Sequence, residues 1–229
     1  MSSQTALKQR AKYERPMIMD RRDLIANDPL VARIIDRAGA LLLLILVLPL
    51  MAFIALGIMI VSPGPVLFKQ KRIGRAGRMF RCYKFRTMNV DADAQLNELL
   101  GRCAESRAQW DADRKLRHDP RVFAFGRFLR RSSLDELPQL FNILRGEMSL
   151  VGPRPIVESE APMYGRYIVH YCSVRPGLTG LWQINGRNDV SYRRRVAFDV
   201  VYARKGRVGD NIRIILQTVP AVLVAKGSY

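Results

Sequence analysis

The chain of 229 residues has few of the side chains that bind metals or form disulfides: it contains three cysteines and two histidines. Cys82, Cys103 and Cys172 are odd in number and lack CxxC spacing, so they indicate neither a disulfide framework nor a zinc site and favour a reducing compartment. No internal repeat, low-complexity tract or serine-rich linker divides the sequence. The two histidines, His118 and His170, are likewise too few and too scattered for a zinc site, and the absence of a dividing segment favours a single globular domain.

Acidic residues are also scarce, with 20 Asp and Glu against 38 Lys and Arg, and the formal net charge is +18. This excess predicts an anionic partner, which can be nucleic acid, anionic lipid headgroups or a phosphorylated substrate. Basic residues next to a membrane each contribute about 1 kcal/mol of binding to anionic lipid. A membrane surface alone therefore accounts for part of the charge, and the charge by itself names no chemistry.

Residues 38–61 form an uncharged run that is longer than the roughly 20 apolar residues needed to cross a bilayer. Basic residues flank the run on both sides, and such flanks favour the cytoplasmic face. Pro49 lies in the middle of the run, where it can bend a helix. We therefore predict a re-entrant membrane helix over residues 31–62, with a straight spanning helix as the alternative. The preceding residues 1–30 are polar and basic, which argues against a cleaved secretory signal.

Residues 63–229 are long enough for one domain, and their pattern predicts an α+β fold that is mainly helical with a small sheet. Residues 66–68 and 80–85 are short apolar or aromatic runs on either side of a glycine turn, and they predict two strands. Residues 92–116 are rich in strong helix formers and predict one helix. The membrane run favours lipid and phosphorylated substrates over nucleic acid as partners of this domain.

Two further segments carry apolar residues at helical spacing. Residues 121–131 interleave phenylalanine with arginine, as in a helix that lies at the headgroup level of a membrane. The last helix presents one apolar face, which we expect to pack into the core. That face consists of Ile212, Ile215, Leu216, Val219, Val222 and Leu223.

The segment that carries candidate chemistry is Arg130 to Gln139, which contains adjacent carboxylates at Asp135 and Glu136. Pro138 disfavours a helix that begins much earlier, so Asp135 is expected at a helix start. The positive end of a helix favours both an ionised carboxylate and a phosphate. The alternative is purely structural, because Ser133 and Glu136 also match a capping box.

Longer motifs surround this segment in a fixed order: KFRTM at residues 84–88, SLDELPQL at 133–140, GEMSLVGPRP at 146–155 and RPGLTG at 175–180. With these motifs, residues 31–229 closely resemble the bacterial sugar transferase family, the monotopic phosphoglycosyl transferases that start surface glycan synthesis on a polyprenyl carrier. Residues 180–192 and the terminal Gly-Ser-Tyr look most like the exopolysaccharide (succinoglycan-type) galactosyl-phosphate transferases.

The resemblance implies transfer of a hexose 1-phosphate from a UDP-sugar to undecaprenyl phosphate, with release of UMP and with Mg²⁺ as cofactor. Galactose is the expected sugar and glucose the next candidate. The reaction would be the first membrane step of exopolysaccharide synthesis, at the cytoplasmic face of the bacterial inner membrane. Self-association is left open.

The resemblance also implies roles for individual residues. Asp135 matches the nucleophile that forms an aspartyl-phosphosugar, and Glu136 matches the second carboxylate, which either positions the metal or activates the lipid phosphate. Both carboxylates are expected metal ligands, and Arg130 matches an arginine that holds phosphate. The further candidates for substrate binding are Lys84, Arg86, Arg154, Arg175, Gln183 and Arg187. For each cation, a solvated surface charge or a lipid contact is the alternative.

Two other classes of function remain open at this point. An anchored basic domain can bind a polyanion without catalysis, and its binding would then depend strongly on salt and not on Asp135. An integral glycosyltransferase would move the sugar without its phosphate and would release UDP instead of UMP.

Overall fold

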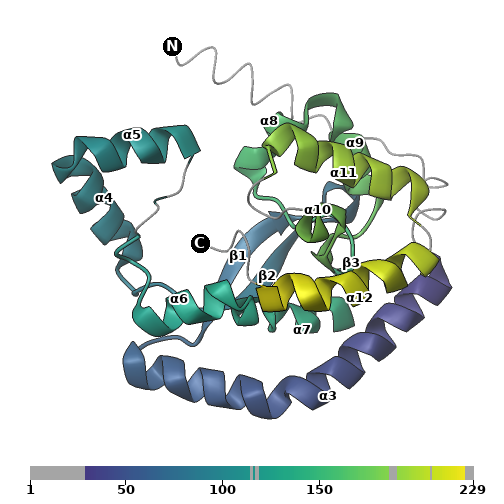
Figure 1. The fold of residues 1–229 in the computed structure, drawn as a ribbon, viewed down its shortest axis with the longest axis horizontal. Coiled ribbons are helices and arrows are strands. Elements are labelled where there is room, and N and C mark those ends of the chain that lie inside the picture. Colours follow the sequence, from purple (N-terminus) through teal and green to yellow (C-terminus); the bar gives the residue numbers. More distant parts are fainter. Residues whose placement is uncertain (1–28, 114–115, 117–118, 186–189, 207, 225–229) are drawn as a thin grey trace.

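The computed structural model describes residues 29–113, 116, 119–185, 190–206 and 208–224. The described residues are mainly helical with a small sheet component, as predicted, although the strands form two separate two-stranded sheets. Figure 1 shows one long helix, α3, running beneath the remaining elements. The predicted division into residues 1–30, 31–62 and 63–229 stays a prediction.

Helix α3 spans Leu30–Val61 and contains Pro49 without ending there. Figure 1 shows that it bends in its middle. It is the one helix among the described residues that is long and apolar enough to cross a membrane, by length and composition alone. Only 17% of its most apolar stretch is buried, so it is not an ordinary core helix. Its length, apolarity and exposure fit a monotopic membrane anchor.

One stripe of α3 packs against the domain. Ala40 joins a buried cluster with Leu140 and Met148, and Ile54 and Ile58 join a second cluster built around Phe85 and Leu129. The other faces of α3 remain exposed, and they carry large apolar side chains at Leu41, Leu42, Ile45, Leu46, Phe53 and Ile60. The anchor helix thus has one face packed against the domain and other faces exposed, although nearly every residue in its middle is apolar.

The predicted strands form an antiparallel hairpin of β1 (Leu67–Ile73) and β2 (Met79–Phe85). The turn between them includes Gly77 at φ 71°, a backbone conformation that glycine adopts without strain. The first strand is longer than the predicted 66–68, because the consecutive polar residues 69–72 continue the pairing with β2.

A second, parallel pair was not predicted: β3 (Ser149–Val151) and β4 (Gly177–Thr179) lie side by side, with Ser149 opposite Gly177. The chains approach so closely that a Cβ atom added at Gly177 would lie 2.0 Å from the nitrogen of Gly152. Glycine is required here because backbone packs on backbone.

Besides α3 and the α4–α5 pair described below, the structure contains further helices and four 3₁₀ turns among the described residues. They are α6 (Ala124–Arg131), α7 (Gln139–Leu144), α8 (Ala161–Tyr164), α9 (Ile168–Ser173), α10 (Leu181–Ile184), α11 (Tyr192–Lys205), α12 (Val208–Val224) and the 3₁₀ turns η1 (Arg75–Gly77), η2 (Leu134–Glu136), η3 (Glu158–Glu160) and η4 (Gly165–Tyr167).

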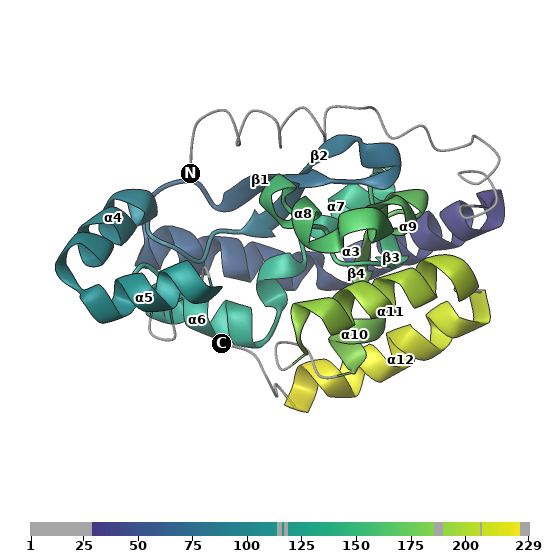
Figure 2. The ribbon, with the colours of Figure 1, turned by 90° about the horizontal axis from the view of Figure 1, so that it is seen from above.

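The prediction of one helix over residues 92–116 was wrong. The chain forms α4 (Ala92–Arg102) and α5 (Ala104–Asp113), which are separated by Cys103 in an extended conformation. The Cys103 thiol accepts a hydrogen bond from the backbone N–H of Ser106 at 3.4 Å, so it caps the second helix. Figures 1 and 2 show the pair at one end of the molecule.

The prediction that the apolar face of the last helix packs into the core was also wrong for the side chains that the structure describes. In α12, Ile212 is 58% exposed and Leu216 is 67% exposed, whereas Ile214 is buried. Helix α12 lies beside α11 (Figure 2) and reaches the core through the opposite stripe. Val219, Val222 and Leu223 lie outside the described side chains.

Candidate active site

Asp135 and Glu136 lie in η2, a 3₁₀ element of one turn that comes just before α7. Ser133, which precedes the turn, has a left-handed backbone with φ 57°, uncommon for a residue other than glycine. Helix α7 begins at Gln139 with Pro138 as its N-cap, so Asp135 precedes the helix start. Ser133 makes no side-chain cap hydrogen bond, which rules out the capping-box alternative. The Glu136 carboxylate instead pairs with Lys84 and Arg154.

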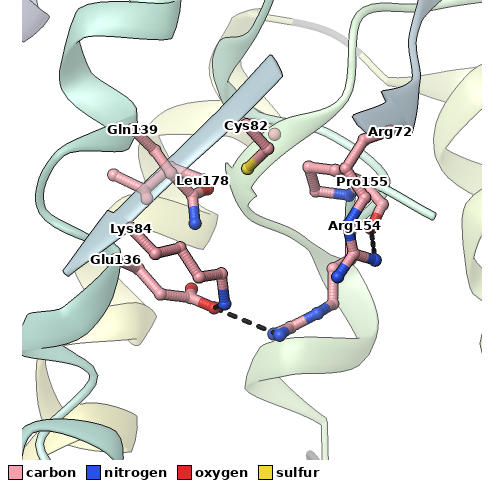
Figure 3. A pocket seen from close by; sticks show the side chains of 9 residues that line it. Arg72, Cys82, Lys84, Glu136, Gln139, Arg154, Pro155 and Leu178 are labelled. Carbon is pink, nitrogen blue, oxygen red and sulfur yellow. Dashed lines mark hydrogen bonds and ion pairs between the residues drawn. The ribbon is translucent and has the colours of Figure 1, made fainter. Parts of the chain in front are cut away.

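Glu136 forms ion pairs with two cations from distant parts of the chain. The Nζ atom of Lys84, on β2, lies 2.6 Å from Oε1 of Glu136, and Nη2 of Arg154, after β3, lies 3.1 Å from the same oxygen. Figure 3 shows the three side chains converging on the pocket. Burial raises the pKa of Glu136, but Lys84 and Arg154 outweigh burial and lower this pKa to about 2. Glu136 is therefore a permanent anion at neutral pH.

Asp135 has a different environment although it is the next residue. Its side chain is buried, and its Oδ2 atom lies 3.8 Å from Nζ of Lys84. Burial raises the pKa of Asp135, and the Glu136 charge raises it further, against the opposing charges of Lys84, Arg154 and Arg130. A buried carboxylate held at this distance keeps oxygens available for reaction. A raised pKa also makes its anion more basic than that of an ordinary aspartate.

Arg130 lies near this pair, at the end of α6. Its Nε atom donates a hydrogen bond to Oγ1 of Thr87 at 2.8 Å. Burial lowers the pKa of Arg130, and the charge of Asp135 raises it, which indicates that the two charges interact. The position of Arg130 fits the phosphate-holding role that the motif implies.

The predicted substrate residues Arg86 and Arg175 lie elsewhere. The guanidinium of Arg86 donates to the carbonyl oxygens of Ser62 and Pro65 and to the Ser62 hydroxyl, at the C-terminal end of α3. That of Arg175 pairs with Asp36 of α3 at 2.8 Å. Both arginines are buried. Their substrate binding stays a prediction, and their described contacts connect the domain to the anchor helix.

Gln183 is not among the residues that line the pocket. The Nε2 atom of Gln183 donates to the carbonyl of Leu178 at 3.2 Å, and its buried Oε1 atom has no hydrogen-bond partner in the described part of the chain. Leu178 lines the pocket, so Gln183 supports its wall. Arg187 lies outside the described residues.

The structure adds a residue that sequence reasoning missed. Arg72, on β1, lines the pocket beside Arg154, and its Nη1 atom donates to the carbonyl of Pro155 at 2.9 Å. Its pKa is lowered by burial and then by the charge of Arg154. Among the basic residues after the apolar run, Arg72 was considered only as a membrane flank. Strand alternation was the available signal, but residues 69–72 are four consecutive polar residues, so the sequence does not show which of them face the pocket.

The pocket thus combines residues from four segments: the β1–β2 hairpin, the η2 turn, the chain after β3 and the start of β4 (Figure 3). Its lining consists of Arg72, Cys82, Lys84, Glu136, Gln139, Arg154, Pro155, Gly177 and Leu178. The described residues contain no group of three or more metal-binding side chains. Asp135 and Glu136 nevertheless suit a Mg²⁺ ion, which usually takes one or two carboxylates together with substrate phosphates.

This combination of anionic carboxylates and convergent cations defines a site for phosphate chemistry. Residues 27–225 match the bacterial sugar transferase family, and the chain therefore belongs to that family.

Three relatives show how widely the similarity extends. The chain is 47% identical over 197 residues to the exopolysaccharide production protein ExoY of Rhizobium meliloti (strain 1021), covering 86% of this chain and 87% of the relative. It is 45% identical over 197 residues to the undecaprenyl-phosphate galactose phosphotransferase of Salmonella typhimurium (strain LT2), covering 86% and 41%. It is 40% identical over 202 residues to the UDP-glucose:undecaprenyl-phosphate glucose-1-phosphate transferase of Xanthomonas campestris pv. campestris, covering 85% and 39%. The chain thus spans less than half of the last two relatives.

Proposed function

We propose that the protein transfers a hexose 1-phosphate from a UDP-sugar to undecaprenyl phosphate and releases UMP. The observation that carries this proposal is the buried Asp135 beside a cluster of cations, in a chain of the bacterial sugar transferase family. The names of the relatives supply the substrate class. Catalysis thereby accounts for a geometry that simple polyanion binding leaves unexplained, since binding needs no buried carboxylate.

The reaction proceeds in two displacements at phosphorus. An oxygen of Asp135 attacks the β-phosphorus of the UDP-sugar, the bond from that phosphorus to the bridging oxygen breaks, and UMP leaves. An oxygen of undecaprenyl phosphate then attacks the same phosphorus, the bond to Asp135 breaks, and the carboxylate is regenerated. The lipid product is undecaprenyl diphosphate sugar. Two steps separate the binding of two polyanionic substrates, so their charges never meet in one complex.

The neighbouring side chains stabilise charge during these steps. Lys84 and Arg154 lie on the pocket side of Glu136, where they can contact the oxygens of the donor diphosphate. Arg130 approaches Asp135 from α6 and holds the phosphoryl group that is transferred. Asp135 and Glu136 would hold Mg²⁺ with the substrate phosphates, and the ion would neutralise phosphate charge.

Galactose is the proposed sugar, with glucose next. This choice rests on residues 180–192 and on the galactose named for the Salmonella relative, whereas the Xanthomonas relative is named for glucose. Undecaprenyl phosphate chains remain in the bilayer, so we place the protein at the cytoplasmic face of the bacterial inner membrane. Helix α3 would enter and leave by that face, because basic clusters flank both of its ends.

The direct test is to identify the nucleotide released from UDP-galactose by the protein in lipid nanodiscs that contain undecaprenyl phosphate. We expect UMP to be released in the same amount as the lipid product is formed. When UDP-sugars compete, we expect galactose to be transferred in preference to glucose and to N-acetylated sugars. Release of UDP would instead establish sugar transfer without phosphate. Binding of UDP-galactose without any product would favour the noncatalytic alternative.

A further inference from the structure

The anchor helix contains one buried acidic residue, Asp36, and the domain surrounds it with donors. Its carboxylate accepts hydrogen bonds from the hydroxyl of Ser149 at 2.8 Å and from the backbone N–H of Leu150 at 3.0 Å. It also pairs with Nη2 of Arg175 at 2.8 Å, and the two side chains are 9% and 6% exposed. An acidic residue in a membrane-associated helix is unfavourable unless its charge is compensated. Here Ser149, Leu150 and Arg175 of the domain provide that compensation.

The donors belong to the β3–β4 pair that forms one wall of the pocket. Ser149 lies opposite Gly177 in that pair, and Arg175 lies two residues before Gly177. The same two segments continue to the pocket residues Arg154 and Leu178. Arg175 also donates to the carbonyl of Met148 at 3.0 Å, which ties the two segments together. A shift of Asp36 would therefore be transmitted to the pocket wall through rigid backbone.

The other end of α3 is fastened independently by Arg86, which binds Ser62 and Pro65. Between the two fastenings lie the exposed apolar side chains of α3, including Leu42, Leu46 and Phe53. This middle part is what a bilayer would hold. Its depth in the bilayer is passed to the domain through the packed stripe of α3 and through the polar contacts of Asp36 and Arg86 near its two ends.

We propose that the Asp36–Arg175 ion pair is a positioning device that sets the height of the Asp135 pocket above the bilayer. The inference rests on the proposed function. The two substrates differ in whether they can reach the pocket only at one particular height. A UDP-sugar arrives from water and reaches the pocket at any height, whereas the phosphate of a polyprenyl lipid lies at the depth that its chain dictates. The ion pair therefore serves the second displacement and not the first.

The experiment separates the two displacements in nanodiscs. Without undecaprenyl phosphate, the amount of UMP released in a single burst reports the first step; with it, formation of lipid-linked sugar reports the second. The test variant is Asp36→Asn/Ser149→Ala, which removes the buried carboxylate charge and one of its donors and leaves the predicted substrate residue Arg175 in place. We expect its burst to stay close to that of the native protein and its lipid step to fall about tenfold or more, because small misplacements of reacting groups are that costly.

A control variant, Asp93→Asn/Ser159→Ala, makes the same chemical changes at two exposed residues and should leave both steps unchanged. If the double variant of Asp36 and Ser149 does not fold, Ser149→Ala alone removes one donor and keeps the pair. It should lower the lipid step alone, by a smaller factor. An equal fall of both steps would show a merely structural role and overturn the proposal, as would an unaffected lipid step in a folded variant.

Failure of the proposed function is distinguishable from failure of this inference. If the native protein gives no UMP burst, the two-step mechanism is wrong whatever the variants do. Hydrogen exchange at the Leu150 amide, which donates a hydrogen bond to Asp36, measures how firmly Asp36 is bound to the domain, and it requires no turnover. Faster exchange at Leu150 in the double variant, together with a lipid step that falls while the burst is kept, is the result that we expect. Unchanged exchange would contradict a fastening through Asp36.

Discussion

Two buried aspartates in this protein lie among cations, and their surroundings are opposite in kind. Asp36 accepts hydrogen bonds from a hydroxyl, a backbone amide and a guanidinium, all within 3.0 Å. Asp135, among the described residues, is held by an ion pair of 3.8 Å to Lys84. A carboxylate whose oxygens are all engaged stabilises structure, whereas a carboxylate that is buried with its oxygens free is primed for reaction. If the proposed function holds, Asp36 is a structural charge and Asp135 is the reacting one.

The environment of Glu136 is intermediate between those of Asp36 and Asp135. It is adjacent to Asp135 in sequence, yet Lys84 and Arg154 hold it as an anion with a pKa of about 2. The pKa of Asp135 is raised. Adjacent carboxylates that are shifted in opposite directions can divide the work of a site, one as a fixed charge and the other as the reacting group.

The largest expected effect is that of Asp135→Asn. If Asp135 is the nucleophile, its amide cannot form the acyl phosphate, and lipid-linked sugar formation should fall about a thousandfold or more. Because burial raises the pKa of Asp135, removal of its charge should leave the melting temperature unchanged or raised. Turnover in nanodiscs and thermal melting provide the two readouts. Asp93→Asn, at an exposed position, is the matched control. Turnover within tenfold of the native rate would refute a covalent role.

The opposite behaviour is expected for Asp36→Asn. This substitution leaves Arg175 buried without its carboxylate partner, so the free energy of unfolding should decrease by about 3–5 kcal/mol. Denaturant unfolding in detergent, with Asp93→Asn as control, measures the change. Equal stability losses for Asp36→Asn and Asp135→Asn would remove the distinction between the two sites.

A smaller effect is expected from Lys84→Gln. The Lys84 charge lowers the pKa of Asp135, so its removal raises that pKa. Since the ionised form reacts, the acidic limb of the activity profile should move to higher pH, and activity at mildly acid pH should decrease more than activity at alkaline pH. A pH profile of the UMP burst tests this. An acidic limb that stays in place or moves to lower pH would exclude Asp135 as the titrating group.

The smallest effect is expected from Pro49→Ala. The substitution restores a backbone donor inside α3 and should straighten the helix, which favours a spanning topology and lowers the lipid step severalfold. Labelling with a membrane-impermeant reagent, at cysteines introduced before Arg33 in intact cells, reports the topology. Labelling of the unsubstituted Pro49 protein from outside would contradict the re-entrant arrangement.

Sequence motifs located Asp135, Glu136, Lys84 and Arg154, because long matched segments identify residues irrespective of the fold. The sequence could not separate those cations from Arg86 and Arg175, which belong to equally distinctive motifs. Their contacts with α3 link residues 24 and 139 positions apart in the chain, and such contacts depend on tertiary packing.

The local errors have equally specific causes. Cys103 interrupts a segment that is rich in helix formers apart from Gly101, and the thiol that caps α5 resembles any small apolar residue in a sequence pattern. Asp36 stood between Arg33 and Arg37 and was overlooked as one charge among many. The β3–β4 pair is only three residues per strand, too short for an alternation to be recognised.

The most direct test of the central claim is the covalent intermediate itself. The native protein in nanodiscs without lipid acceptor is mixed with UDP-galactose labelled at the β-phosphorus, and the protein is digested and analysed by mass spectrometry. The account predicts a hexose-phosphate adduct on the peptide that contains Asp135, lost when undecaprenyl phosphate is added. A native protein that produces lipid-linked sugar and UMP while never carrying the label would contradict it.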